Sequence, residues 1–180
     1  MSSLIIGILG KIHAGKSTLA KELSQQLNVP IISFGGYLRK YSEAKGLPAD
    51  RRSLQDLGNK KISEDAMKFL SDVLLSCDMS TEIIIIEGIR HASVFNALKS
   101  IFKVSYFIYC DTPFEERYRR YTDREETKEM SIEEFQAIDE HIVEKEIEKL
   151  KEHCQTVLGN IDTATVKLKI ETYYNSFKHH

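Results

Sequence analysis

The chain has 180 residues, of which 42% are hydrophobic and 29% charged, and its formal net charge is −2. This composition predicts one folded domain with a sizeable core and argues against a general nucleic-acid binder or a protein held to anionic membranes. The three cysteines are too far apart for a zinc ribbon, and no apolar run reaches the roughly 18 residues of a membrane span. We therefore expect a cytoplasmic protein with reduced thiols. The closing pair His179–His180 is interpreted as the remnant of a purification tag.

Five short runs rich in β-branched and aromatic residues predict strands, and segments with helical periodicity separate them. The run EIIIIE at 82–87 is apolar throughout, as expected of a strand that is covered on both faces of a parallel sheet. Strands that alternate with helices predict an α/β fold with a doubly wound, five-stranded parallel sheet. The predicted strands are 4–9, 30–34, 82–87, 104–110 and 156–160.

Cap signals predict where two of the intervening helices begin. The segment DTP at 111–113 puts proline in a first turn, and Glu115 follows Thr112 by three residues, the spacing of a capping box. Ser131 begins another helix, where Glu134 completes a capping box. The predicted helices begin at the glycine-rich loop near 16, near 62, after 113 and at 131, and the last runs to about 150.

Two polar inserts, at roughly 35–60 and 117–131, have too little apolar content for core, and we expect them to be mobile flaps. Within a single domain over 1–180, we assign 35–78 to an acceptor-binding insert and 117–131 to a lid.

Residues 10–17, GKIHAGKS, fit the phosphate-loop pattern G-x-x-x-x-G-K-[ST] without a mismatch. The glycines let backbone N–H groups turn toward a β-phosphate, Lys16 can bridge the β- and γ-phosphates, and the Ser17 hydroxyl can bind Mg²⁺. His13 either caps the phosphates from outside or faces solvent, and we favour solvent. The pattern therefore predicts binding of ATP or GTP with Mg²⁺. The expected nucleotide-binding residues are Gly10, His13, Ala14, Gly15, Lys16, Ser17 and Thr18.

The segment IISFGGYLR at 31–39 resembles the I-S-T-G-D-L-L-R segment of adenylate-kinase-like nucleoside monophosphate kinases, except that Gly36 stands where the family has Asp. The resemblance implies that Arg39 holds the phosphate of the acceptor nucleotide. That role suits a guanidinium, which can donate two parallel hydrogen bonds to a phosphate. The alternative is a surface arginine after a turn.

The segment IIIIEGIR at 83–90 ends a buried strand in an acidic residue, where a phosphate-loop protein keeps the carboxylate that orients Mg²⁺. The E-G-I-R step resembles the D-G-x-R step of nucleoside and deoxynucleoside monophosphate kinases. The resemblance implies that Glu87 serves the metal and that Arg90 reaches the acceptor phosphate. Because Glu is one methylene longer than Asp, Glu87 acts through a water or serves the acceptor side instead. The alternative for Arg90 is a structural ion pair.

The segment DRRSLQDLGNKK at 50–61 resembles the R-x-x-L-Q-x-L-G element of phage-type deoxynucleoside monophosphate kinases. In that comparison Arg52 and Gln55 lie in an acceptor-side flap, and Gln55 is free to read a base edge. The alternative is a plain helix cap and a turn that ends at Gly58.

The segment EERYRRYTDREE at 115–126 resembles the short lid of the same kinases, and Arg120 and Arg124 meet its R-x-x-x-R spacing. The resemblance implies that these arginines close over the transferring phosphoryl group and neutralise its growing charge, with Arg117 ranking next. The alternative is a solvated helix face whose arginines pair with nearby glutamates.

Arginines on two flaps with a phosphate loop between them predict phosphoryl transfer to a small phosphate-bearing acceptor. The resemblance covers residues 4 to about 160 and implies an ATP- and Mg²⁺-dependent nucleoside or deoxynucleoside monophosphate kinase. No Asn/Thr-Lys-x-Asp guanine reader is present, which argues against a GTPase switch. Dephospho-coenzyme A kinase is the alternative enzyme, with Glu87 as base for a hydroxyl acceptor. The alternative outside the kinases is a nucleotide-gated ATPase that docks a protein or RNA partner on the acidic segment 131–153.

Overall fold

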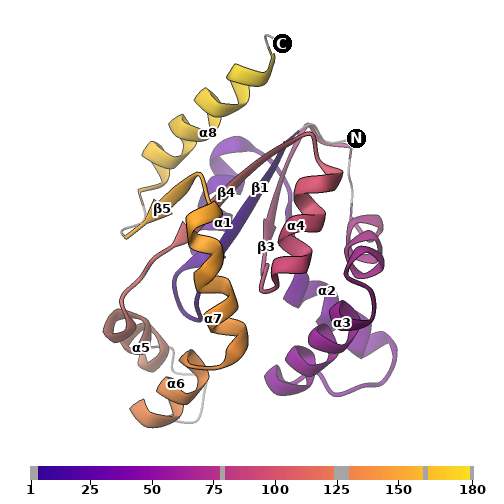
Figure 1. Cartoon of the computed structure of the whole chain (residues 1–180), viewed down its shortest axis with the longest axis vertical. Coiled ribbons are helices and arrows are strands. Elements are labelled where there is room, and N and C mark those ends of the chain that lie inside the picture. Colours follow the sequence, from indigo (N-terminus) through magenta and orange to yellow (C-terminus); the bar gives the residue numbers. More distant parts are fainter. Residues whose placement is uncertain (1–3, 78–79, 124–129, 160–161, 179–180) are drawn as a thin grey trace.

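The computed structural model of the chain describes residues 4–77, 80–123, 130–159 and 162–178. Its centre is a five-stranded parallel sheet with the strand order β2-β3-β1-β4-β5 (Figure 1). All five predicted strands are present, and the last ends before residue 160, which lies outside the described residues. The strands are β1 (Leu4–Gly10), β2 (Ile31–Ser33), β3 (Ile83–Glu87), β4 (Val104–Cys110) and β5 (Thr156–Leu158).

Helices cover both faces of the sheet because its central strands are apolar on both sides. In β1, Ile5 and Leu9 belong to a core cluster with α3, α4 and α7, whereas Ile6 and Ile8 pack with α1 and α8. Figure 1 accordingly shows α4 and α7 in front of the sheet and α1 behind it. The helices are α1 (Lys16–Leu27), α2 (Phe34–Ala44), α3 (Arg51–Leu75), α4 (Ala92–Ile101), α5 (Phe114–Thr122), α6 (Ile132–Asp139), α7 (Ile142–Lys149) and α8 (Thr163–Lys178), with a 3₁₀ turn at Leu150–His153.

The order of the strands places a binding crevice at the end of β1. The chain leaves β1 toward one side for β2 and β3 and toward the other side for β4 and β5, so the direction of winding reverses beside β1. In open α/β sheets, ligands bind outside the carboxyl ends of the strands at such a reversal. The phosphate-loop pattern follows the carboxyl end of β1 directly.

The interpretation of the two polar inserts as too polar for core is wrong for their helical parts. Leu38 of α2 and Leu54 of α3 are buried in the cluster beneath α4, and Tyr121 of α5 is buried against the phosphate loop. Gly58 does not end a turn, because α3 continues through it to Leu75, with one non-helical residue at Asp65. A Cβ at Gly58 would lie 3.0 Å from the Leu38 Cδ1, so glycine allows α2 and α3 to approach each other closely.

Two predictions about the helices between 111 and 150 need correction. The Ser131–Glu134 capping box is confirmed, but α6 ends at Asp139 and His141 caps a separate helix, α7, by accepting a hydrogen bond from the Val143 N–H. The capping box of Thr112 with Glu115 is wrong. The Thr112 hydroxyl instead donates to the carbonyl oxygen of Ala14 at 3.0 Å, because the end of β4 lies against the phosphate loop.

No helix in the described part of the chain is long and apolar enough to cross a membrane.

Candidate functional site

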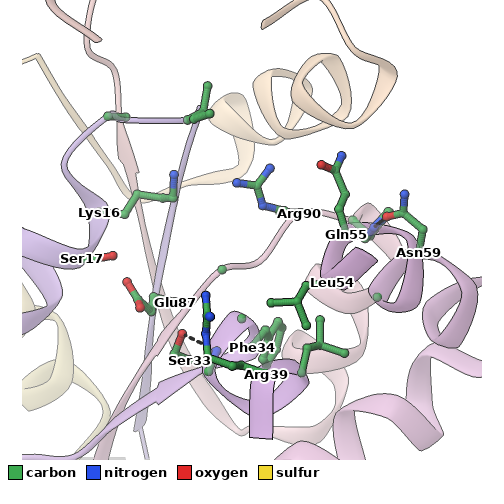
Figure 2. Close-up of a pocket in the computed structure, with 18 of the residues that line it drawn as sticks. Lys16, Ser17, Ser33, Phe34, Arg39, Leu54, Gln55, Asn59, Glu87 and Arg90 are labelled. Carbon is green, nitrogen blue, oxygen red and sulfur yellow. Dashed lines mark hydrogen bonds between the residues drawn. The ribbon is translucent and has the colours of Figure 1, made fainter. Parts of the chain in front are cut away.

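A cavity of about 430 Å³ opens at the carboxyl ends of β1, β2 and β3. Its wall consists of the phosphate loop after β1, the first turn of α2 after β2, and the segment 87–91 that follows β3. The inner side of α3 completes it with Leu54, Gln55, Asn59 and Ile62. Figure 2 shows Lys16 and Ser17 on one side of this cavity and Gln55 and Asn59 on the other.

The phosphate loop winds tightly because three of its residues have positive φ. Gly10 has φ 139°, His13 has φ 57° and Gly15 has φ 89°. A Cβ at Gly10 would lie 2.6 Å from the carbonyl oxygen of Cys110, so only glycine fits beside β4. Gly15 is the N-cap of α1, which directs the N-terminal amides of that helix at the cavity.

Lys16 lines the phosphate-loop side of the cavity, and its ammonium Nζ donates to the carbonyl oxygen of Lys11 at 2.6 Å. Burial disfavours the charged form and, together with the positive charge of Arg90, lowers the pKa of Lys16 to about 8. The negative charges of Glu144 and Glu87 act in the opposite direction. Ser17 and Glu87 are the two residues that were expected to serve Mg²⁺. Figure 2 shows them next to each other, below Lys16.

Acidic and basic side chains from α5, α6 and α7 hold the loop from outside. The Ile12 N–H donates to the Glu144 carboxylate at 3.0 Å, and the Ile12 carbonyl accepts from Arg117 at 3.4 Å. Lys11 forms ion pairs with Asp139 at 3.3 Å and with Glu148 at 3.1 Å. The roles of Asp139 and Glu144 were missed at the level of sequence, because nothing distinguishes them there from the other acids of 131–153.

That acidic segment is therefore not a uniformly solvated docking face. Glu144 is buried, Glu148 pairs with Lys11, and Glu146 lies 3.6 Å from His91. Three other acids of the segment, Glu133, Glu134 and Glu140, are exposed.

The cavity is lined by three of the four residues that were predicted to bind the acceptor. Arg39 extends from α2, is exposed and forms no ion pair within the described ranges. Gln55 lines the wall that α3 forms on the other side of the cavity. Arg90 lines the same cavity, and its Nη1 also contacts the Glu144 Oε1 at 2.5 Å. Arg90 therefore both lines the cavity and forms an ion pair, so the geometry is compatible with either predicted role. Figure 2 shows Arg39 beside Glu87.

Arg52 lies apart from the other three predicted binding residues, and His13 is oriented differently from the expectation. Arg52 is exposed outside the cavity, because the helical turn that begins at Asp50 directs Leu54 and Gln55 inward instead. His13 does not simply face solvent. It packs on Tyr121 and Phe135, with ring-centroid distances of 5.4 and 6.0 Å, while also lining the cavity.

Sequence reasoning also missed a pair of polar residues at the cavity's edge. The His91 Nε2 and the Asn59 Oδ1 are 3.0 Å apart. Both residues line the cavity, one after β3 and the other on α3. Asn59 follows Gln55 by one helical turn in α3, and this pair of amides on one face of the helix was visible in the sequence.

The predicted lid arginines have different environments. Arg117 is buried and bound to Asp139, so it is a structural residue rather than a solvated one. Arg120 and its neighbour Arg119 both pair with Glu116, as the alternative of a solvated helix face expects. Arg124 lies outside the described residues.

A parallel sheet of this order with a GKIHAGKS loop between β1 and α1 defines a phosphate-loop α/β domain, so the predicted fold class is confirmed. The sequence profile described as an AAA domain matches residues 6–151, and the chain belongs to this family. No curated protein matches the chain.

Solved structures share this fold at low sequence identity. A shikimate kinase from Acinetobacter baumannii in complex with shikimate is 17% identical, with a TM-score of 0.63 and coverage of 99% of this chain and 96% of that one. A shikimate kinase from Aquifex aeolicus is 20% identical, with a TM-score of 0.57 and coverage of 97% and 98%. A gluconokinase from Sinorhizobium meliloti is 14% identical, with a TM-score of 0.57 and coverage of 99% and 98%.

Proposed function

We propose that the chain is an ATP- and Mg²⁺-dependent kinase that transfers the γ-phosphate to a small anionic acceptor, first of all a nucleoside or deoxynucleoside monophosphate. The observation that carries this proposal is a single cavity with the phosphate loop at one side and a cationic, amide-lined wall at the other. Its volume of about 430 Å³ falls within the range of small-molecule sites. The phosphate groups of two reactants can therefore meet in one cavity.

The donor half follows from the loop. Lys16 and the first amides of α1 bind the β- and γ-phosphates of ATP. A hydroxyl and a carboxylate, those of Ser17 and Glu87, line the same side of the cavity, and this oxygen donor set fits Mg²⁺. When bound, the ion neutralises charge on the transferring phosphate. Lys16 supplies the protein's own positive charge at that place.

The acceptor half rests on Arg39 and Arg90. Their guanidinium groups hold the acceptor phosphate, and Gln55 with Asn59 offers amide groups to a base edge. A phosphate oxygen is already anionic at neutral pH, so the reaction needs positioning and charge neutralisation rather than a strong base. Arg120 and Arg124 act from the lid.

A hydroxyl acceptor is the second candidate, and the position of Glu87 favours it. Its carboxylate lines the cavity beside Arg39 and makes no hydrogen bond or ion pair among the described residues. A carboxylate in that place can accept the proton of an attacking hydroxyl. Dephospho-coenzyme A carries such a hydroxyl, and so do shikimate and gluconate, which the names of the similar structures suggest.

ADP production from ATP·Mg²⁺ tests these alternatives against a panel of nucleoside and deoxynucleoside monophosphates, dephospho-coenzyme A, shikimate and gluconate. A large stimulation by a monophosphate supports the first candidate, and stimulation by a hydroxyl acceptor supports the second. Lys16→Ala should abolish the activity, whereas Lys21→Ala, an exposed lysine on the same helix, should retain it. Slow hydrolysis that ignores every acceptor would reject both candidates and favour a nucleotide-gated ATPase with a macromolecular partner.

A further inference from the structure

Glu144 is a buried carboxylate that contacts both halves of the site. It lies in the first turn of α7, with its side chain 3% exposed. Its Oε1 is 2.5 Å from the Arg90 Nη1, and its Oε2 accepts from the Ile12 N–H at 3.0 Å. Each oxygen of one rigid, planar group therefore holds a different element, the acceptor-side arginine and the donor-side loop.

The position of Glu144 is itself fixed by packing. Its neighbours Val143 and Ile147 are buried in the core cluster on that face of the sheet. One turn before α7, Asp139 binds both Lys11 of the loop and Arg117, and Arg117 contacts the Ile12 carbonyl. The Ile12 residue is thus held at its N–H by one ionic group and at its carbonyl by another.

Glu144 also balances the positive charges of the site. Lys16 and Arg90 are two cations that line one cavity, and they repel each other. This repulsion opposes having both side chains charged and directed into the cavity at the same time. The charge of Glu144 acts on Lys16 in the opposite sense and pairs directly with Arg90. A buried charge without its partner is costly, so the three groups hold one another in place.

We propose that Glu144 is a positioning residue that fixes the phosphate loop and the guanidinium of Arg90 in one mutual geometry, and thereby couples nucleotide binding to the acceptor side. The inference rests on the proposed function for its acceptor half, because Arg90 faces the acceptor only if that function is correct. Its donor half concerns the loop alone. Glu144 touches no reacting atom in this scheme and acts through Ile12 and Arg90.

ADP affinity, measured by calorimetry without turnover, tests the donor half. Glu144→Gln keeps the shape but replaces the charge and one acceptor oxygen, and we expect it to weaken ADP binding about tenfold or more, since a hydrogen bond to a charged group is lost. Glu144→Asp is too short to reach both partners and should show a smaller loss of the same kind. Glu152→Gln removes an exposed acid just after α7 and serves as the matched control. Wild-type ADP affinity in both Glu144 variants would overturn the proposal, and a thermal melt of each variant establishes that it is folded.

A double-mutant cycle with Arg90→Ala tests the coupling. If Glu144 and Arg90 act as one unit, the double variant should bind ADP no more weakly than Glu144→Gln alone, because Arg90 has already lost its position there. Losses that add independently would contradict the coupling. Failure of the proposed function gives a different result. In that case no acceptor of the panel would stimulate ADP release, but the ADP affinities of the variants would still follow the pattern described above. With an active acceptor, Glu144→Gln should raise its KM as well, and an unchanged KM would reject the acceptor half.

Discussion

Arg117 and Asp139 form a buried ion pair beneath the phosphate loop, with 2.5 Å between the Arg117 Nη1 and the Asp139 Oδ1. Their side chains are 3% and 12% exposed. Burial alone would raise the pKa of Asp139, but the hydrogen bond and charge of Arg117, together with Lys11, hold this pKa below its ordinary value. The pair joins α5 to the end of α6 and contacts the loop through Ile12 and Lys11.

Removal of one member of this pair should destabilise the protein strongly. We expect Arg117→Ala to lower the free energy of unfolding by about 3–5 kcal/mol, because it leaves an unpaired charge in a buried place. Urea denaturation measures the loss. Arg119→Ala, which breaks an exposed ion pair two residues further along the same helix, should have no measurable effect. If both variants lost the same free energy of unfolding, the buried Arg117–Asp139 pair would stabilise the protein no more than the exposed pair does.

A methyl group at Gly10 should be tolerated much less well than one at Gly35. Gly10 has φ 139°, and a Cβ added there would lie 2.6 Å from the backbone carbonyl oxygen of Cys110, whereas the nearest atom to a Cβ at Gly35 is 4.0 Å away. We expect Gly10→Ala to cost more than about 2 kcal/mol of stability. Gly35→Ala lies in the first turn of α2 and should be neutral or stabilising by up to about 1 kcal/mol. Thermal or urea unfolding of both variants tests this order, which a loss in Gly35→Ala as large as that in Gly10→Ala would contradict.

The sheet and the phosphate loop could be predicted because their signals are local. A short β-branched run such as IIII is typical of a buried strand, and the glycines and lysine of 10–17 are needed at fixed spacing around a phosphate. Arg39 could be placed for a similar reason, since its helix begins directly after a strand.

The support of the site could not be predicted, because it depends on contacts distant in sequence. Glu144 reaches Ile12 across 132 residues, and its direction depends on the break between α6 and α7, which the predicted continuous helix lacked. The environment of His13 is set by Tyr121 and Phe135, which are also far from the loop in sequence. Periodicity alone also could not tell Arg52, outside the cavity, from Gln55, inside it.

His91 should make stability depend on pH between neutrality and mild acid. Burial lowers the pKa of His91, Arg90 lowers it further, and Glu146 opposes both. In the unfolded chain its pKa returns to about 6.5, so on acidification the unfolded state takes up the proton first. The stabilisation is therefore complete above about pH 6.5 and decreases as the pH falls toward the lower pKa of the folded state. Urea midpoints at several pH values should fall less steeply for His91→Gln than for the wild type. Identical slopes for His91→Gln and the wild type would reject this assignment.

Arg119 and Arg120 offer a matched test of the lid, because both bind Glu116 but differ in direction. Arg119 is 66% exposed, whereas Arg120 is 35% exposed and its charge acts on the Cys110 thiol, as does that of Lys16. If Arg120 closes over the transferring phosphate, Arg120→Ala should lower kcat at least about a hundredfold, as the loss of a preorganised charge does at a reacting centre. Arg119→Ala should leave kcat near the wild-type value, and neither change should alter the melting temperature. Steady-state kinetics with the best acceptor of the panel measures the difference, and equal kcat values in the two variants would assign Arg120 to the solvated face of α5 instead.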